Sequence, residues 1–142
     1  MNYWIIALPR PDMEHCIKIG TFGKDRKIAI GKVKAGDKIA CYVTGECRFI
    51  ALGEATSDYY MDDSRIFKAD GIFPDRFDFK AKLLGKNREA DIKEMVDDLR
   101  FITNKLYWSV FFRAGIKQIP ANDWEYIVNR MNNGTNLKTT TR

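Results

Sequence analysis

The chain is poor in the residues from which most catalytic and metal sites are built. It holds a single histidine, His15, which excludes most two-histidine metal sites. Its position beside Glu14 is typical of a histidine on the surface. No base is evident for Ser57, Ser64 or Ser109, so a catalytic triad would have to use His15. We therefore expect no catalytic set, no metal and no cofactor, and a protein that acts by binding.

Cysteine is also scarce, and the three present do not suggest a disulfide. Cys16, Cys41 and Cys47 are odd in number and show no CxxC spacing. If a hairpin turns at residues 45–46, Cys41 faces Ile50 and is out of register for a bridge to Cys47. We therefore expect reduced, inert thiols, as is usual for a cytoplasmic protein.

Long apolar runs are missing as well. No stretch approaches the roughly 20 apolar residues that a membrane-spanning helix needs. The first residues lack the basic and apolar regions of a signal peptide. What is present is a 142-residue chain with 45% hydrophobic residues, which is enough for one domain with its own core. The net charge of +5 favours an anionic partner.

Hydrophobic patterns predict several short strands. Residues 3–8 are apolar on both faces, which predicts a central strand covered on both sides. Residues 38–43 and 48–56 flank a glycine turn and predict a hairpin. Strict alternation over residues 76–83 predicts a strand with its aromatic residues in the core and its charged residues, including Arg76, in water.

Other segments fit helices or irregular structure. Residues 11–17 and 91–101 have the spacing of short helices, and Pro120 can open a final helix. Residues 108–111 suggest a short strand or an extended turn. Residues 132–142 are polar and predict a disordered tail. The sequence thus predicts one α+β domain over residues 1–131, in which a mostly antiparallel sheet curls into a barrel with helices packed outside.

Aromatic residues make up 13% of the chain, and one group of them lies among cations. The segment from Lys105 to Arg113 holds four aromatic rings between these two cations and no acidic residue. Such a face can stack a base while it holds the phosphate. Tyr107 and Trp108 are neighbours, so one of the two rings must point away from the interior if the segment is extended.

Three further rings are candidates for the same role. Phe22 lies in a Gly-Thr-Phe-Gly sequence, which suits either packing or a place on a loop rim. Tyr60 and Phe67 belong to a long polar loop over residues 58–75, where they either contact a ligand or anchor the loop to the core. The cations expected to contact phosphates around these rings are Lys24, Arg26, Lys27, Arg65, Lys105 and Arg113.

An ordered series of short motifs resembles the EVE domain. No single motif decides the resemblance, but together they cover about residues 1–130. The motifs are Tyr3-Trp4-Ile5, Phe22-Gly23, residues 32–38, Glu54-Ala55-Thr56-Ser57, Tyr60-Met61-Asp62, Ser64-Arg65-Ile66-Phe67, residues 98–102, Trp108-Ser109 and Asp123-Trp124. The resemblance implies a PUA-like fold and kinship with YTH and ASCH domains.

The resemblance also implies roles for particular residues. Phe22 stands where related domains often have a tryptophan as one wall of an aromatic cage, and Tyr60 and Phe67 lie in the loop that supplies the opposite wall. Trp108-Ser109 match the floor of the pocket. Pro9 and Arg10 stand where YTH relatives place polar groups that contact the base. The chain departs from the related domains at two positions: Phe22 stacks less well than a tryptophan, and Pro9 has no N–H to donate.

The function implied is a module that binds nucleic acid without catalysis and reads a modified, methylated base, beside a fused or separate effector domain. DNA and RNA are both open as the partner. One alternative is a general RNA-binding module without preference for a modification. A second is a hydrolase of the ASCH type, with Asp62 or Asp98 as the acid or base. A third is a domain that binds a small ligand or another protein through the same pocket.

Overall fold

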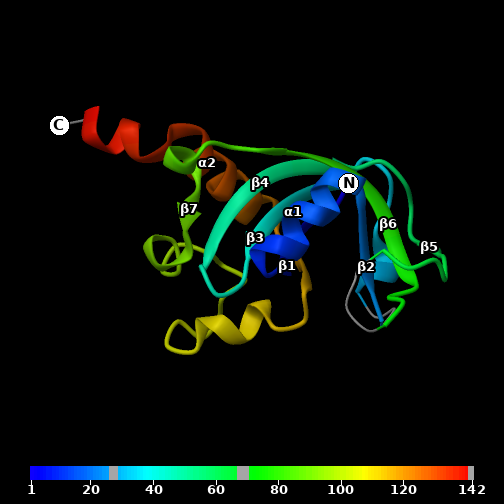
Figure 1. Ribbon diagram of the computed structural model, residues 1–142. Coiled ribbons are helices and arrows are strands. Elements are labelled where there is room, and N and C mark those ends of the chain that lie inside the picture. The colour runs from blue at the N-terminus through cyan, green and yellow to red at the C-terminus, as the bar shows by residue number, and fades with distance from the viewer. Residues whose placement is uncertain (26–28, 67–70, 141–142) are drawn as a thin grey trace.

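The computed structural model describes residues 1–25, 29–66 and 71–140 of the chain, and it shows one curled sheet with helices packed against it (Figure 1). The strands are β1 (Tyr3–Leu8), β2 (Thr21–Lys24), β3 (Lys38–Val43), β4 (Arg48–Ala55), β5 (Tyr60–Met61), β6 (Asp75–Leu83), β7 (Ala90–Asp91) and β8 (Ile116–Ile119). The α-helices are α1 (Arg10–Ile19) and α2 (Ala121–Thr140). Single 3₁₀ turns form η1 (Ile30–Lys32), η2 (Lys86–Arg88), η3 (Ile92–Glu94) and η4 (Trp108–Phe112).

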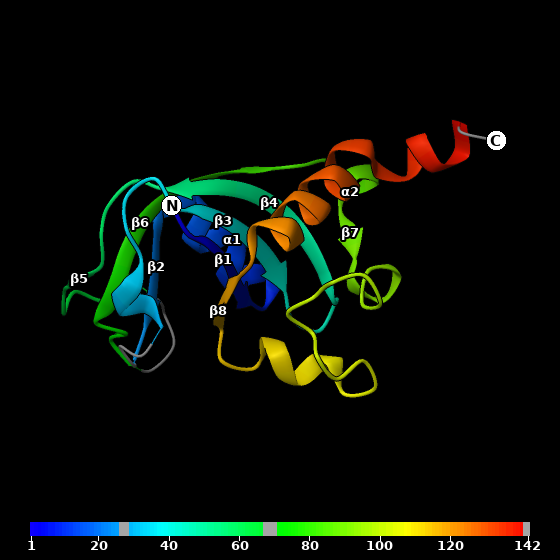
Figure 2. The same cartoon turned by 180° about the vertical axis from the view of Figure 1, so that it is seen from behind.

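The sheet is mixed but mostly antiparallel. Its main strands follow the order β2-β6-β4-β3-β1-β8, with β5 on β6 and β7 on β4. Only one of the described pairings is parallel, that of β1 with β3. The sheet curls strongly, so β2 and β6 turn away from β1 and β3 (Figure 2). The predicted fold class, a curled antiparallel sheet with helices outside, is confirmed.

Strand β1 lies inside the sheet, between β3 and β8. Residues 4–7 are buried, so the prediction of a central strand covered on both sides is confirmed. Alternate residues of β1 enter two separate cores: Trp4 and Ile6 on one face, Ile5 and Ala7 on the other. Because both faces of β1 are buried, its residues are apolar throughout and do not alternate between apolar and polar.

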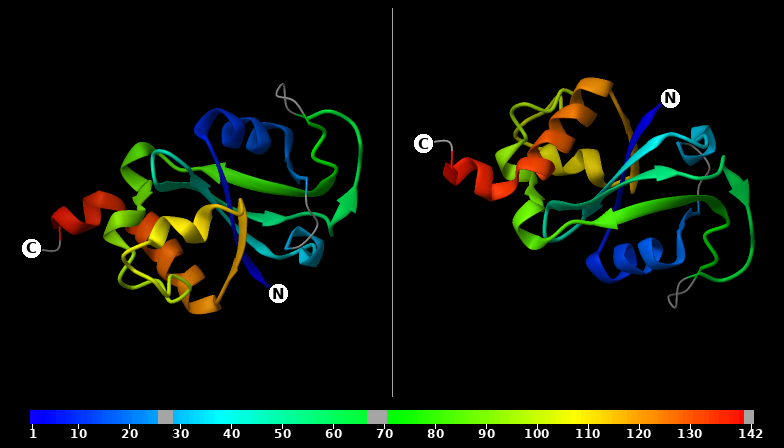
Figure 3. Two further views of the ribbon diagram at one scale, coloured as in Figure 1. Left: turned by 90° about the horizontal axis from the view of Figure 1, so that it is seen from below. Right: turned by 90° about the horizontal axis from the view of Figure 1, so that it is seen from above.

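Each face of the sheet is covered by one α-helix (Figure 3). Met13 and Cys16 of α1 belong to the core on the first face. Ile127 and Met131 of α2 belong to the core on the second face, together with Phe112 of η4. The domain therefore consists of a helix, a curled sheet, and a layer formed by α2 and the segment that leads to it.

The hairpin of β3 and β4 has the predicted strands but a different register. Val43 pairs with Arg48, so four residues, 44–47, form the turn. A bulge after Cys41 then places Cys41 opposite Ala51 and not opposite Ile50. All three cysteines are free, and Cys16 and Cys41 are buried.

Several predicted elements differ from the structure. Residues 91–101 form η3 and turns rather than one helix, and residues 108–112 form a 3₁₀ turn rather than an extended segment. Both segments pack rings and aliphatic side chains into the second core, so tertiary contacts override their local preference. Helix α2 extends to Thr140, and the expectation of a disordered tail over residues 132–142 stays a prediction.

Arg76 was expected to face water but is buried, with 2% of its surface exposed. Its guanidinium donates to the carbonyl oxygens of Phe73, Ile72 and Ser64 and to the Ser64 hydroxyl, and it lies 3.5 Å from a carboxylate oxygen of Asp62. The polar face of β6 is covered here by the preceding loop, which alternation along a strand cannot reveal. These carbonyl oxygens accept the hydrogen bonds of the Arg76 guanidinium and so offset the cost of burying its charge.

Candidate functional site

The predicted aromatic cage is not assembled in the structure. Phe22 lies in β2 with none of its surface exposed, and its ring centroid is 5.6 Å from that of Phe77 in the core. Of its neighbouring glycines, Gly20 caps the end of α1 with a positive φ, and Gly23 lies in β2 close to the backbone of Phe73. The assignment of Phe22 as an open pocket wall is therefore corrected: the ring is a core residue.

Tyr60 lies on the opposite face of β6 from Phe22. Phe22 pairs with Phe77 and Tyr60 pairs with Arg76, and adjacent strand residues point to opposite faces. The Tyr60 hydroxyl is 2.6 Å from a carboxylate oxygen of Asp78, to which it donates a hydrogen bond. Tyr60 and Phe22 therefore do not meet at one hollow, and Phe67 lies outside the described residues.

Trp108, Ser109 and Arg113 do lie together, at one open pocket. The other lining residues come from the end of β3 and the turn after it. We call this the aromatic pocket, and its lining residues are Tyr42, Thr44, Gly45, Cys47, Trp108, Ser109, Phe112 and Arg113. Its volume is about 210 Å³. A cavity of about 150 Å³ can hold one benzene molecule, so this pocket has room for a single heterocycle.

The rings of the pocket rest on one another. Tyr42 and Phe112 are stacked with centroids 4.0 Å apart and planes 14° apart, and Trp108 packs edge-on to Phe112 at 6.3 Å. Tyr42 and Phe112 are buried, whereas Trp108 is half-buried and its neighbours Tyr107 and Ser109 are exposed. Burial raises the pKa of the Tyr42 phenol, so its hydroxyl stays protonated and can donate a hydrogen bond.

The segment before η4 is held in place by a buried carboxylate. Asp123, in the first turn of α2, accepts hydrogen bonds from the backbone N–H groups of Arg100 and Phe101, both at 2.8 Å. The Lys105 ammonium donates to the carbonyl oxygen of Leu99 at 2.7 Å. One wall of the aromatic pocket is thus tied to α2, while the other belongs to the β3–β4 turn.

The predicted phosphate partners are only partly gathered here. Arg113 lines the aromatic pocket, and the ammonium of Lys24 lies beside Gly115, two residues further on. Lys105 is exposed on the same segment, whereas Arg65 is exposed on the distant loop after β5. Arg26 and Lys27 lie outside the described residues. Residues 99–119 hold four cations and no acidic residue, a pattern that sequence reasoning noticed only for 105–113.

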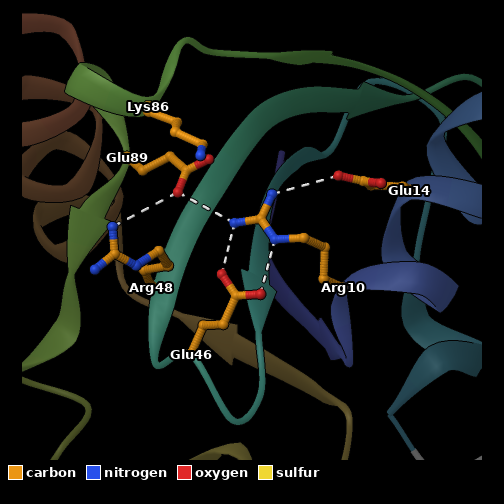
Figure 4. A pocket seen from close by; sticks show the side chains of 6 residues that line it. All are labelled: Arg10, Glu14, Glu46, Arg48, Lys86 and Glu89. Carbon is orange, nitrogen blue, oxygen red and sulfur yellow. Dashed lines mark hydrogen bonds and ion pairs between the residues drawn. The ribbon is translucent and has the colours of Figure 1, made fainter.

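A second cavity, of about 690 Å³, lies on the other side of the β3–β4 turn (Figure 4). We call it the charged cavity, and its lining residues are Arg10, Glu14, Glu46, Arg48, Lys86 and Glu89. Both Arg48 of the charged cavity and Tyr42 of the aromatic pocket flank the turn, but they point to opposite faces of the hairpin.

Arg10 is committed to carboxylates in this cavity. It meets both oxygens of Glu46 at 2.8 and 2.7 Å, Glu89 at 3.2 Å and Glu14 at 3.3 Å. The hydrogen bonds from Arg10 hold the pKa of Glu46 below its usual range. Pro9 is exposed and precedes the first residue of α1. The role expected for Pro9 and Arg10, contact with a base beside Phe22 and Tyr60, is therefore not supported by their surroundings.

Among residues 1–25, 29–66 and 71–140, no three histidine, cysteine or acidic side chains are placed to hold a metal ion. His15 is half-buried, and its Nε2 lies 2.5 Å from the carbonyl oxygen of Ile66. None of the helices described combines the length and the apolar surface required to cross a membrane.

Comparison with known proteins gives the family. The UPF0310 protein PH1033 of Pyrococcus horikoshii is 31% identical over 140 residues, which cover 89% of this chain and 97% of that protein. The chain belongs to the UPF0310 family. The UPF0310 protein PYRAB08750 of Pyrococcus abyssi is 27% identical over 141 residues, with the same two coverages. No protein-family model matches the sequence.

Solved structures share the fold of this UPF0310 chain at low sequence identity. Rpa0253 from Rhodopseudomonas palustris has a TM-score of 0.68 and 14% identity, and covers 93% of this chain and 94% of its own. The YTH domain of Zygosaccharomyces rouxii MRB1, in complex with N6-methyladenosine RNA, has a TM-score of 0.63 and 13% identity, with 92% and 86% coverage. The chain therefore has the PUA-like fold of YTH domains.

Proposed function

We propose that this UPF0310 protein is a non-catalytic, EVE-type module that binds nucleic acid and holds one base in the aromatic pocket. The observation that carries the proposal is the pocket itself: about 210 Å³, with Trp108 half-buried at its edge and Arg113 beside it. A half-buried indole offers a face for stacking, and a neighbouring guanidinium offers an attachment for a phosphate. This site differs from the cage expected at Phe22 and Tyr60, but it keeps Trp108, Ser109 and Arg113.

A base inside a duplex has to leave the stack to reach such a pocket. Flipping requires a few kcal/mol, and stacking on an aromatic side chain returns about 1–3 kcal/mol per base. Phosphate contacts add a share that falls with salt concentration. A single-stranded or destabilised site is therefore the preferred target.

We propose further that the base carries a methyl group, as it does in the N6-methyladenosine RNA bound to the YTH domain of similar fold. Burying one methyl group adds about 0.8 kcal/mol. Selectivity beyond a few-fold needs hydrogen bonds to the base edge. The hydroxyls of Ser109 and Tyr42, both lining residues, can supply them.

The test is a binding panel with unmodified, methyladenine and methylcytosine oligonucleotides, each as DNA and as RNA. We expect Trp108→Ala to weaken binding about 5- to 150-fold, since stacking on an aromatic ring contributes about 1–3 kcal/mol. Because Trp108 is half-buried, the variant should remain folded, which circular dichroism verifies. Val110→Ala, at an exposed neighbouring position, is the matched control.

Two results would speak against the proposal. Unchanged affinity in a folded Trp108→Ala protein would remove the aromatic pocket from the binding site. Equal affinity for methylated and unmodified strands, with a steep dependence on salt, would leave a general RNA-binding module without preference for a modification.

A further inference from the structure

The charged cavity gathers cations from three separate segments of the chain. Arg10 begins α1, Arg48 begins β4, and Lys86 begins η2. Their side chains approach one hollow of about 690 Å³ between α1 and the start of β4 (Figure 4). Within the described residues, the Lys86 ammonium has no hydrogen bond and no ion pair. Arg10 and Arg48 are paired with carboxylates of the cavity, and Lys86 is therefore the cation that is least tied to them.

The carboxylates of the cavity differ in how firmly they are fixed. Glu89 has a side chain 6% exposed and lies 3.2 Å from Arg10 and 3.6 Å from Arg48, so it orients both guanidinium groups from behind. Glu46 lies in the β3–β4 turn with a side chain 43% exposed. It meets Arg10 through two parallel hydrogen bonds, the arrangement that an arginine also offers to a phosphate. Because Glu46 is open to solvent, a phosphate that offers the same pair of acceptor oxygens can compete with it for Arg10.

The position of Glu46 links this cavity to the aromatic pocket. Its chain neighbours Gly45 and Cys47 both line the aromatic pocket. A strand whose base enters the aromatic pocket would therefore pass its backbone across the turn that carries Glu46. This step depends on the function proposed above.

We propose that the charged cavity binds a phosphate group of the nucleic-acid strand, which takes the place of Glu46 on Arg10. Arg48 and Lys86 hold the remaining phosphate oxygens, and Glu89 keeps the two arginines in position. With Glu46 in place, three cations face three carboxylates. When Glu46 moves away, the cations outnumber the carboxylates, so the cavity attracts one anion.

The experiment compares Glu46→Gln with Glu54→Gln. Glu54 is a matched control because it is 52% exposed, is paired with Lys38 at 2.6 Å, and changes the net charge by the same amount. We expect Glu46→Gln to bind a short single-stranded oligonucleotide about three- to tenfold more tightly than wild type at low salt, and Glu54→Gln to differ much less. Lys86→Ala should weaken binding, while Lys34→Ala, an exposed lysine elsewhere, should have a smaller effect.

A second arm uses inorganic phosphate in place of the oligonucleotide, followed by the amide signal of Glu46 in an NMR titration. A phosphate-dependent shift that persists in Trp108→Ala would support the phosphate site even if the aromatic pocket fails as a base site. Equal effects of Glu46→Gln and Glu54→Gln on oligonucleotide binding would overturn the proposal. A shift of the Glu46 amide signal with inorganic phosphate but not with the oligonucleotide would also overturn the proposal.

Discussion

The carboxylate of Asp37 ties the start of β1 to the turn before β3. It is 2% exposed and accepts hydrogen bonds from the Trp4 indole N–H at 2.9 Å and from the backbone N–H groups of Asn2 and Lys34. Trp4 is fully buried, so its indole serves the fold. Trp108 lacks such a partner within the described residues and is half-buried beside an open pocket. Surroundings, not residue type, separate a structural tryptophan from a candidate for binding.

The three thiols provide a residue-scale prediction. Burial raises the pKa of Cys16 to about 12 and that of Cys41 well above its usual range, so both stay protonated and shielded near pH 8. Cys47 is half-buried and lines the aromatic pocket. We expect iodoacetamide to modify Cys47 alone in the folded protein and all three cysteines in denaturant, as peptide mass spectrometry would show.

The same labelling reports on the pocket. A methylated oligonucleotide bound there should slow the modification of Cys47 by covering the thiol. In the Trp108→Ala protein, which should no longer bind the oligonucleotide, adding the oligonucleotide should not slow the modification of Cys47. Rapid labelling of Cys16 or Cys41 in native protein would show that the core around them is more open than the structure indicates.

At the scale of elements, the close approach of β4 and β6 depends on Gly53. A Cβ at this position would lie 2.1 Å from the carbonyl oxygen of Lys80 and 2.7 Å from the Cα of Ala81, both in the backbone of β6. Gly53→Ala therefore forces the two strands apart, and we expect a loss of about 2–3 kcal/mol in the free energy of unfolding. Urea denaturation measures this loss.

Gly85→Ala is the matched control for this strand contact. A Cβ there would meet only the side-chain oxygen of Asn87, at 3.1 Å, and that side chain can turn aside. We expect a change much smaller than at Gly53. Equal stability of the Gly53→Ala protein and wild type would mean that β4 and β6 are not packed as closely as described.

Sequence patterns predicted some elements well and others poorly, for physical reasons. The β3–β4 hairpin and the central strand β1 follow from local composition, because a glycine turn and a doubly buried strand leave clear patterns. The 3₁₀ turn at 108–112 and the turns at 92–99 are set by packing against α2 and β3, which no local pattern contains.

The site was harder to predict than the fold, and the failures have a common cause. Phe22 and Tyr60 were expected to meet, but strand pairing with β6 sends them to opposite faces. The charged cavity went unnoticed because Arg10, Glu46 and Glu89 are far apart in the chain. Only the cluster that is contiguous in sequence, around Trp108, could be found without the topology.

At the scale of the whole molecule, the β3–β4 turn lies between two different sites. The aromatic pocket uses the face of the hairpin that packs towards α2, and the charged cavity uses the face towards α1. One turn of four residues can thus contact a base on one side and a phosphate on the other. The chain shares its curled sheet with YTH domains. The side chains of the aromatic pocket and of the charged cavity would supply the contacts to a base and to a phosphate.

The most direct test of the central claim is an NMR titration that follows the three tryptophan indole N–H signals while a methylated oligonucleotide is added. Trp4 is an internal control because it is buried and bonded to Asp37, and Trp124 packs against Tyr3 with ring centroids 5.8 Å apart. The account predicts that the Trp108 signal shifts on binding while the Trp4 signal stays in place. A Trp108 signal that does not move while the oligonucleotide binds would contradict it.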